Sequence, residues 1–322
     1  MNPFLDQLSR NFIVPINDLT YLIRSAPYRY KVYKIAKRKK GQKRTIAQPA
    51  RELKILQYWV MENVLQVFPV HAAATAYRKG KNIADNAQPH VAHSYVCKMD
   101  FKNFFPSIKA TDFERFMSKN PLAAAWTQED IGQMSRILFW KQRRGGELLM
   151  SIGAPSSPML SNILLYDFDV EVAALCAEYG VTYTRYADDM TFSTNEQGVL
   201  REVEQKIPAI CRRIQSPKLT VNKEKTVHAS KKGARRVTGL VLTNDGLVSI
   251  GREKKRIIRA TFHAYTLGKL KPEEINALAG MVAYVKSVEP KYLQQIAKKY
   301  GAMALNKLLA GRGPKNPPKL KI

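Results

Sequence analysis

The sequence predicts a mixed α+β fold. Stretches in which apolar and polar residues alternate, as they do in strands, stand between stretches with apolar residues at helical spacing. The two kinds follow one another without regular β-α alternation, which disfavours a doubly wound parallel sheet. With 322 residues, 45% of them hydrophobic, the chain is long enough for two or three units with cores of their own.

The N-terminal part is expected to hold a helix, a β-hairpin and a second helix. Residues 4–26 have helical character, with Asn17 or Asp18 as the candidate N-cap. The alternating stretch "YRYKVYKIAK" predicts a strand, and a Lys-Gly turn leads to a returning strand around "RTIAQP". Residues 53–67 then repeat apolar side chains at helical spacing.

The rest of the chain is expected to mix short strands with helices. The stretch "SYVCKMDF" predicts a strand with Cys97 and Met99 on one face and Lys98 and Asp100 on the other. A long helical region follows. After it we expect a helix that starts in "GAPSSP", a hairpin in "VTYTRYADDMTFST", a helix near 197–214, strands around 219–228 and 235–250, and a basic helical region from residue 251.

The chain is strongly basic. Fifty-three Lys and Arg residues stand against 26 Asp and Glu residues, which gives a formal net charge of +27. Such an excess destabilises a compact protein unless a polyanion is bound, and nucleic acid is the commonest polyanion. Residues 28–44 hold nine Lys or Arg residues, three Tyr residues and no acid. Cations and aromatic rings together favour a nucleic-acid surface; a generally basic, solvated surface is the alternative.

Other features disfavour several classes of protein. Cys97, Cys176 and Cys211 lie far apart without C-x-x-C spacing, which disfavours a disulfide framework and a Cys-rich zinc site. No apolar run approaches the roughly 20 residues of a membrane span. The first residues do not resemble a signal peptide. We therefore expect a cytoplasmic protein with no membrane partner.

Two adjacent aspartates, Asp188 and Asp189, interrupt a segment that otherwise reads as strand. The apolar alternation changes phase between Tyr183 and Phe192, which predicts a tight hairpin turn at residues 187–189. Aspartate favours turns, so two turn residues without any chemical role are one interpretation.

A third carboxylate favours a different interpretation. Asp100 ends another short strand, and beside Asp188 and Asp189 it would complete a cluster of the hard oxygen ligands that Mg²⁺ prefers. Two Mg²⁺ ions about 3.5–4 Å apart can activate a 3′-hydroxyl and stabilise leaving pyrophosphate. Because three close carboxylates repel one another without cations, the sequence favours a catalytic metal site.

Three motifs resemble those of reverse transcriptases. Residues 186–189, "YADD", match the Tyr-x-Asp-Asp signature; "KMDFKNFFPSI" resembles the first catalytic motif, and "GAPSSPMLSN" the Gly/Pro/Ser motif that contacts template and substrate. "NAQPH" at 86–90, "VTG" at 237–239, "IAQPARELK" and "TRYADD" are similar to segments of retron reverse transcriptases. The sequence is identified as a member of that bacterial family, and the resemblance runs from about Tyr28 to Tyr284.

The resemblance implies a right-hand polymerase architecture. Residues 1–95 would form an N-terminal helix and the fingers, with part of the fingers interleaved at about 110–150. Residues 96–250 would form the palm, with an antiparallel sheet, helices and a primer-grip-like hairpin. Residues 251–322 would form a basic helical thumb and a flexible tail.

The resemblance also implies an activity and its partners. Such enzymes are RNA-directed DNA polymerases that copy part of a structured noncoding RNA of the msr-msd type, starting from a 2′-hydroxyl of that RNA. The product is a branched RNA–DNA, msDNA, used in anti-phage defence. Implied partners are this RNA and its DNA product, dNTPs, an effector protein and a host RNase H. An RNA-binding scaffold for a toxic effector, with polymerisation secondary, is the alternative function.

The family motifs imply roles for individual residues at the reaction centre. The catalytic and metal-binding set, with two Mg²⁺ per active site, is Asp100, Asp188 and Asp189. Phe105 aligns with the aromatic gate that excludes a ribonucleotide 2′-hydroxyl; plain core packing is its alternative. The other expected nucleotide contacts are Lys43, Arg44, Arg51, Gly153, Ala154, Pro155 and Lys225, the last of which could protonate pyrophosphate. Nonspecific backbone binding or simple solvation remains open for these cations.

RNA and primer contacts are expected from two further groups. The first holds the motif residues Tyr186, Asn86, His90, Val237, Thr238 and Gly239. The second is a cationic stripe on a helix over residues 251–265, formed by Arg252, Lys255, Arg256 and Arg259, with Ile257, Ile258 and Phe262 packing against the palm. A thumb that clamps any primer–template is the alternative for the stripe. One departure concerns Ile152, where relatives often carry Gln.

Overall fold

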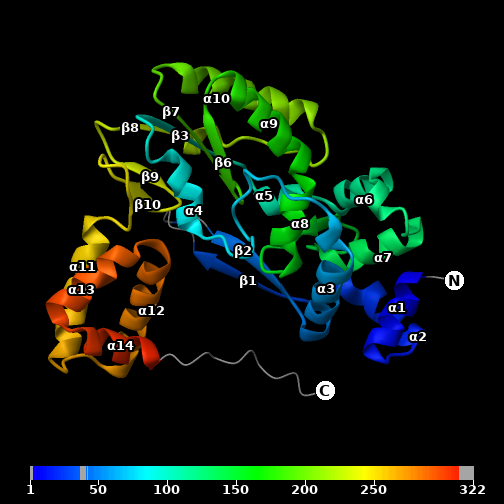
Figure 1. Ribbon diagram of the computed structural model, residues 1–322. Helices are drawn as coiled ribbons and strands as arrows, with labels where there is room; N and C mark the ends of the chain where they lie inside the picture. The colour runs from blue at the N-terminus through cyan, green and yellow to red at the C-terminus, as the bar shows by residue number, and fades with distance from the viewer. Residues whose placement is uncertain (1–2, 37–40, 42, 312–322) are drawn as a thin grey trace.

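The computed structural model describes residues 3–36, 41 and 43–311, and arranges helices around small antiparallel sheets (Figure 1). The main sheet has the strand order β6-β7-β3-β8, and every pairing in it is antiparallel. The predicted α+β class is confirmed. The expected flexible tail falls largely on residues 312–322, outside the described residues.

The elements before the main sheet are two helices, a hairpin and a third helix. They are α1 (Pro3–Phe12), α2 (Ile16–Ser25), β1 (Tyr30–Ala36), β2 (Lys43–Pro49) and α3 (Arg51–Asn63). The hairpin and α3 agree with the sequence prediction.

The central elements carry the strands of the main sheet. They are α4 (Ile83–Ala87), β3 (Tyr95–Asp100), α5 (Phe104–Ser107), α6 (Ala110–Lys119), α7 (Gln128–Leu138), β4 (Phe139–Lys141), β5 (Leu148–Met150), α8 (Ser156–Leu164), α9 (Tyr166–Glu178), β6 (Thr182–Tyr186), β7 (Asp189–Thr194) and α10 (Val199–Arg213).

The C-terminal elements are short strands followed by a helical bundle. They are a 3₁₀ turn (Lys223–Lys225), β8 (Val227–Ser230), β9 (Arg235–Val237), β10 (Leu240–Leu242), β11 (Val248–Ser249), α11 (Arg252–Thr266), α12 (Pro272–Val288), α13 (Pro290–Tyr300) and α14 (Ala302–Ala310). In Figure 1 the bundle lies on the opposite side of the molecule from α1 and α2, with the β1–β2 hairpin and α3 between them and the main sheet above.

The predicted helix over residues 4–26 is wrong as a single element. Ile13 adopts φ 54°, in the left-handed region, and ends the helical path after α1. Pro15 is the N-cap of α2, so Asn17 and Asp18 lie in the first turn and do not cap the helix. The proline has no N–H to continue α1, which explains why the chain restarts there.

The strand predicted around 219–228 is also largely wrong. The chain makes only an isolated bridge from Val221 to Phe101 and then a 3₁₀ turn over Lys223–Lys225. Regular pairing with β3 begins at β8, where His228 lies opposite Cys97. The turn brings Lys225 to the end of β3.

Alternation along β3 divides its side chains between two hydrophobic cores. Cys97, Met99 and Phe101 enter the main core, which α9 and α10 cover on one side of the sheet (Figure 1). Val96 enters a second core, built from β9–β11 and the bundle α11–α14. This second core starts before residue 251, the predicted beginning of the thumb, and it also takes in Ala87 and Val91.

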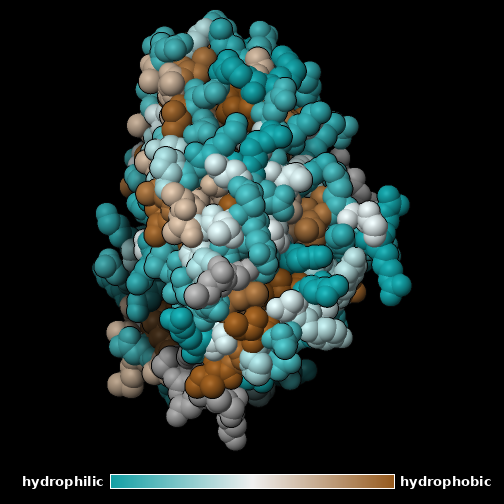
Figure 2. All heavy atoms as spheres, turned by 90° about the vertical axis from the view of Figure 1, so that its right-hand side faces the viewer, coloured by the Kyte–Doolittle hydropathy of each residue, from teal (hydrophilic) through white to brown (hydrophobic). Residues whose placement is uncertain are grey.

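The face that carries α1, α2, α6 and α7 is mostly hydrophilic, with separate hydrophobic patches (Figure 2). Ile13 and Tyr21 of this N-terminal region are 91% and 71% exposed. None of the described helices is long and apolar enough to cross a bilayer.

A buried ion pair lies beneath the hairpin formed by β6 and β7. Arg185 of β6 and Asp169 of α9 are both fully buried, and the guanidinium donates from Nε and Nη2 to the two carboxylate oxygens, at 2.8 and 2.5 Å. Burial alone would lower the pKa of Arg185, but the Asp169 carboxylate raises it above its ordinary value. The pair therefore keeps both charges inside the protein.

The same arginine reaches three further segments. Its Nη1 donates to Ala187 O at 3.0 Å and to Asn162 Oδ1 at 3.2 Å. Its backbone pairs with the 73–75 segment, through Arg185 N to Ala73 O at 2.7 Å and Thr75 N to Arg185 O at 2.9 Å. The hairpin turn is thus anchored to α8, to α9 and to a loop.

We predict that Asp169→Asn strongly destabilises the fold. The amide keeps the shape of the side chain but leaves the buried Arg185 charge without its counter-charge, which costs about 3–5 kcal/mol. Glu171→Gln is the matched control, since it removes the partner of the exposed Arg213 from the same helix and should change little. Urea unfolding midpoints measure both variants, and equal midpoints would contradict the prediction.

Candidate active site

Two of the three predicted aspartates are direct neighbours across the main sheet. Asp100, the last residue of β3, is the register partner of Asp189, the first residue of β7. Asp188 stands in the turn between β6 and β7, next to Ala187, which adopts φ 56°. The positive φ lets the chain reverse within two residues, so the strand ends bring all three carboxylates to one end of the sheet.

The pKa values of Asp188 and Asp189 show that the carboxylates lie within electrostatic range of one another. Burial and then the charge of Asp100 raise the pKa of Asp188. Burial and then the charges of Asp188 and Asp100 raise the pKa of Asp189 to about 6. Because the side chain of Asp189 retains solvent contact, water screens part of this repulsion. A cation at this place would favour the ionised forms.

Lys225 is the cation in contact with this group. Its Nζ lies 2.8 Å from both carboxylate oxygens of Asp100. The lysine comes from the 3₁₀ turn, and Asn222 N donates to Asp100 O at 2.7 Å, so the turn is fixed to the end of β3. The Lys225 side chain remains 56% exposed, which leaves its ammonium accessible to solvent.

The hairpin of β1 and β2 contributes a second cation. Burial raises the pKa values of Asp188 and Tyr77, and the charge of Arg44 opposes part of each rise, which places the guanidinium within electrostatic reach of the turn. Lys43 and Arg51 are exposed on β2 and at the start of α3. The structure shows no interaction between these two residues and the aspartates, so their triphosphate role stays a prediction.

Phe105 is half-buried and lines a pocket of about 360 Å³ together with the predicted low turn. The pocket is lined by Phe105, Ile152, Gly153, Ala154 and Pro155. Three residues that the sequence did not predict also line it: Lys54, Tyr58 and Tyr77. Tyr77 has φ 60°, and burial followed by the Asp188 charge raises its pKa. The motif positions thus share one pocket close to the aspartates.

The backbone conformation and the close neighbours of Gly153 disfavour any side chain at this position. Its φ is 125°, and a Cβ at this position would lie 3.1 Å from Ala47 O and from Ile46 Cγ2 of β2. Ala47 N donates to Ile152 O at 2.9 Å, and Ser151 Oγ donates to Ala47 O. The Gly-Ala-Pro turn is therefore packed against the hairpin. Ile152 contributes its carbonyl to this contact and also lines the pocket.

Asn86 and His90 do not offer the RNA contact predicted for them. Both side chains are fully buried. Asn86 Oδ1 accepts from Thr75 Oγ1 at 2.8 Å, and the His90 ring nitrogens lie 2.6 Å from Ser193 Oγ and 2.8 Å from Thr184 Oγ1. Burial and then His93 lower the pKa of His90 to about 3, so the ring is neutral at neutral pH. These residues support β6 and β7 from inside.

The second family marker has a similar internal role. Val237 is fully buried in the second core, so its predicted RNA contact is not available to its side chain. Thr238 has φ 48° and donates to Ile83 O at 3.1 Å, and Gly239 has φ 80°. The marker is a tight turn between β9 and β10 that ties the second core to α4. Tyr186, by contrast, is half-exposed beside Tyr77, with ring centroids 6.3 Å apart.

Helix α11 presents most of the predicted cationic stripe to solvent. Arg252, Arg256 and Arg259 are exposed. Lys255 instead turns toward the bundle, with Nζ 2.5 Å from Glu289 Oε1 and 5.0 Å from the ring centroid of Tyr292. Ile258 and Phe262 are buried as predicted, whereas Ile257 is 47% exposed. Lys255 faces inward because it lies on the side of the helix shared with Ile258.

Comparisons with known proteins agree with the motifs. The family model "Reverse transcriptase (RNA-dependent DNA polymerase)" matches residues 35–260. The retron Ec83 reverse transcriptase of Escherichia coli is 38% identical over 294 residues, covering 90% of this chain and 93% of the relative. The retron Ec86 reverse transcriptase, also of Escherichia coli, is 32% identical, covering 94% of this chain and 92% of the relative.

The solved structures that match this chain include telomerases. Apo telomerase from Candida tropicalis has a TM-score of 0.46 at 13% identity, covering 84% of this chain and 58% of that chain. Family membership rests on the sequence matches and on the aspartates that the sheet brings together. This chain belongs to the reverse transcriptase family, as an RNA-directed DNA polymerase of the retron group.

Proposed function

We propose that this polymerase copies part of a structured noncoding RNA into single-stranded DNA, starts from a 2′-hydroxyl of that RNA, and so produces a branched RNA–DNA. The meeting of Asp100, Asp188 and Asp189 at one end of the main sheet is the observation that carries the chemistry. Similarity to retron reverse transcriptases supports the choice of template. A defence role with an effector protein, and template removal by a host RNase H, rest on the same similarity.

The aspartate group fits Mg²⁺. All of its donor atoms are carboxylate oxygens, the hard ligands that this ion prefers, and burial together with mutual repulsion raises the pKa values of Asp188 and Asp189. Asp100 and Asp188, with Asp189 beside them, would hold two ions. Bound Mg²⁺ would lower the pKa of the attacking hydroxyl and neutralise charge on the triphosphate. Lys225, in contact with Asp100, is placed to give a proton to departing pyrophosphate.

The surrounding surfaces receive roles that agree with their charge. We assign the β1–β2 hairpin and α3 to the fingers, where Lys43, Arg44 and Arg51 would grip the triphosphate. The main sheet forms the palm, and the bundle α11–α14 forms the thumb. Arg252, Arg256 and Arg259 of α11 would contact RNA phosphates and 2′-hydroxyls, since structured RNA is recognised mainly through its shape and backbone.

Asp188→Asn should abolish DNA synthesis and leave RNA binding nearly unchanged. The amide keeps the side-chain shape but loses the charge that holds the metal ion. The assay is incorporation of labelled dNTPs on the RNA that copurifies with the protein, with debranching enzyme used to identify a 2′-linked product. Polymerase activity in the variant would contradict the metal assignment, whereas an active wild-type enzyme whose product resists debranching would contradict the priming proposal.

The Mg²⁺ requirement should increase as the pH falls through about 6. The raised pKa of Asp189 means that the metal must displace a proton below this pH, while above it the carboxylate is already ionised. The measurement is the Mg²⁺ concentration for half-maximal polymerisation over a pH range of roughly 5.5 to 8, which crosses the shifted pKa. A half-maximal concentration that stays constant would argue against Asp189 as a ligand.

Phe105→Ala should allow ribonucleotides into the DNA product. Removal of the ring enlarges the pocket beside the Gly-Ala-Pro turn and leaves room for a 2′-hydroxyl. The measurement is the ratio of kcat/KM for rNTP and dNTP, with Phe105→Tyr as the control that keeps the ring. If the alanine variant polymerises with unchanged selectivity, the gate is another residue.

A further inference from the structure

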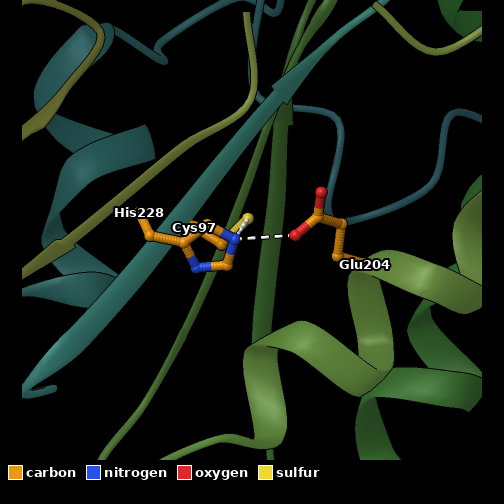
Figure 3. A group of neighbouring side chains, drawn as sticks. All are labelled: Cys97, Glu204 and His228. Carbon is orange, nitrogen blue, oxygen red and sulfur yellow. Dashed lines mark hydrogen bonds and ion pairs between the residues drawn. The ribbon is translucent and has the colours of Figure 1, made fainter. Parts of the chain in front are cut away.

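Three potential metal ligands meet on the side of the main sheet that α10 covers, away from the aspartates. Cys97 of β3 and His228 of β8 are register partners, and Glu204 reaches them from α10. Their ligand atoms all lie within 4.8 Å of one another, and the side chains point together (Figure 3). Across the part of the chain that the structure describes, this is the one group of His, Cys and acidic residues with such spacing.

The cluster is separate from the proposed Mg²⁺ site. Cys97 and Asp100 are three positions apart on β3, so their side chains project from opposite faces of the strand. The two groups also differ in chemistry. Thiolate, imidazole and carboxylate together suit zinc, whereas Mg²⁺ prefers oxygen ligands alone.

The distances within the cluster match a tetrahedral zinc site in part. Zinc bonds of about 2.3 Å to sulfur and about 2.05 Å to nitrogen place the two atoms about 3.6 Å apart at the tetrahedral angle. Cys97 Sγ and His228 Nε2 lie 3.6 Å apart. His228 Nε2 and Glu204 Oε2, now 2.7 Å apart, would have to separate to about 3.3 Å. A rotation of the Glu204 side chain, which is 31% exposed, can supply that movement.

An ion can reach the cluster from solvent. The His228 side chain is 40% exposed and lines a pocket of about 360 Å³ at the edge of the sheet. Three protein ligands leave the fourth tetrahedral position to a water molecule from this side. The cysteine, by contrast, is buried and fixed within β3.

We propose that Cys97, Glu204 and His228 form a zinc-binding site that joins β3, β8 and α10. On binding, the zinc–sulfur bond replaces the S–H bond, and the thiol proton goes to solvent. Burial and then the Glu204 charge raise the pKa of Cys97 to about 12, so this proton is present before binding and zinc affinity should rise with pH. The bound ion would hold together β3, which ends at Asp100, and β8, which follows the turn that contains Lys225.

Cobalt titration of the full-length protein tests the site. The protein is freed of metal with a chelator and titrated with Co²⁺ in the presence of excess Mg²⁺, which occupies the aspartates. We expect a thiolate-to-cobalt charge-transfer band that saturates at one equivalent and disappears when Zn²⁺ is added. Absence of this band in the wild-type protein would overturn the proposal.

Matched variants locate the binding site. Cys97→Ser and His228→Gln should lose the band, while Cys176→Ser, which removes another buried thiol, should keep it. Asp188→Asn should also keep it, and its loss there would assign the metal to the catalytic group instead. Because His228 is partly exposed, its variant should fold normally, and Zn²⁺ should raise the Tm of wild type and Cys176→Ser but not of His228→Gln. If both cluster variants kept an unchanged band, the cobalt would be bound elsewhere and the zinc site would be overturned. The contact between His228 and Glu204 would then be a hydrogen bond without a metal.

Discussion

The buried pair of Arg185 and Asp169 fixes the reaction centre in place. A charge held without water must be fully bonded, because an unpaired one costs several kcal/mol. Arg185 meets this requirement through Asp169, Asn162 and the carbonyl of Ala187, so satisfying the arginine also sets the path of the turn that carries Asp188. The hydrogen bonds that the buried Arg185 charge requires therefore also hold Asp188 in position at the end of the sheet.

The aspartates face the opposite problem. Their charges are close together at the end of the sheet, with Lys225 and Arg44 supplying positive charge from two other segments. The fold thus maintains a local concentration of negative charge within a protein of net charge +27. That contrast suits an enzyme that must hold cations at one point while its outer surface attracts a polyanion. Tyr183, whose hydroxyl donates to Asp169 at 2.8 Å, links the two arrangements through β6.

Periodicity and short motifs predicted the α+β class, the β1–β2 hairpin and the position of Asp100 beside Asp188 and Asp189. They did not predict interactions that depend on distant segments. Nothing in the strand around Arg185 indicates that it is buried, since its partner Asp169 belongs to a helix whose pattern looks ordinary. The motif match predicts RNA contacts for Asn86 and His90, but a sequence motif does not indicate whether its side chains are buried. Burial depends on the distant segments that pack over them. The cluster joins Cys97 to Glu204 and His228, each more than a hundred positions away, beyond the reach of any local pattern.

The division of β3 between two cores limits how the molecule can be rearranged. Val96 and Cys97 are adjacent, yet they belong to different cores, and fully buried Arg235 donates to the carbonyls of Val91 and Thr243, which ties β9 to the segment before β3 and to the end of β10. A chimera that took only the region after residue 250 from a relative would separate half of the second core from its partners. Transfer of an intact second core between family members would instead require a segment that begins before β9, together with compatible residues at 87, 91 and 96. The unit that can be exchanged intact is therefore the whole second core, including the residues before β9 that pack into it, and not the helical bundle alone.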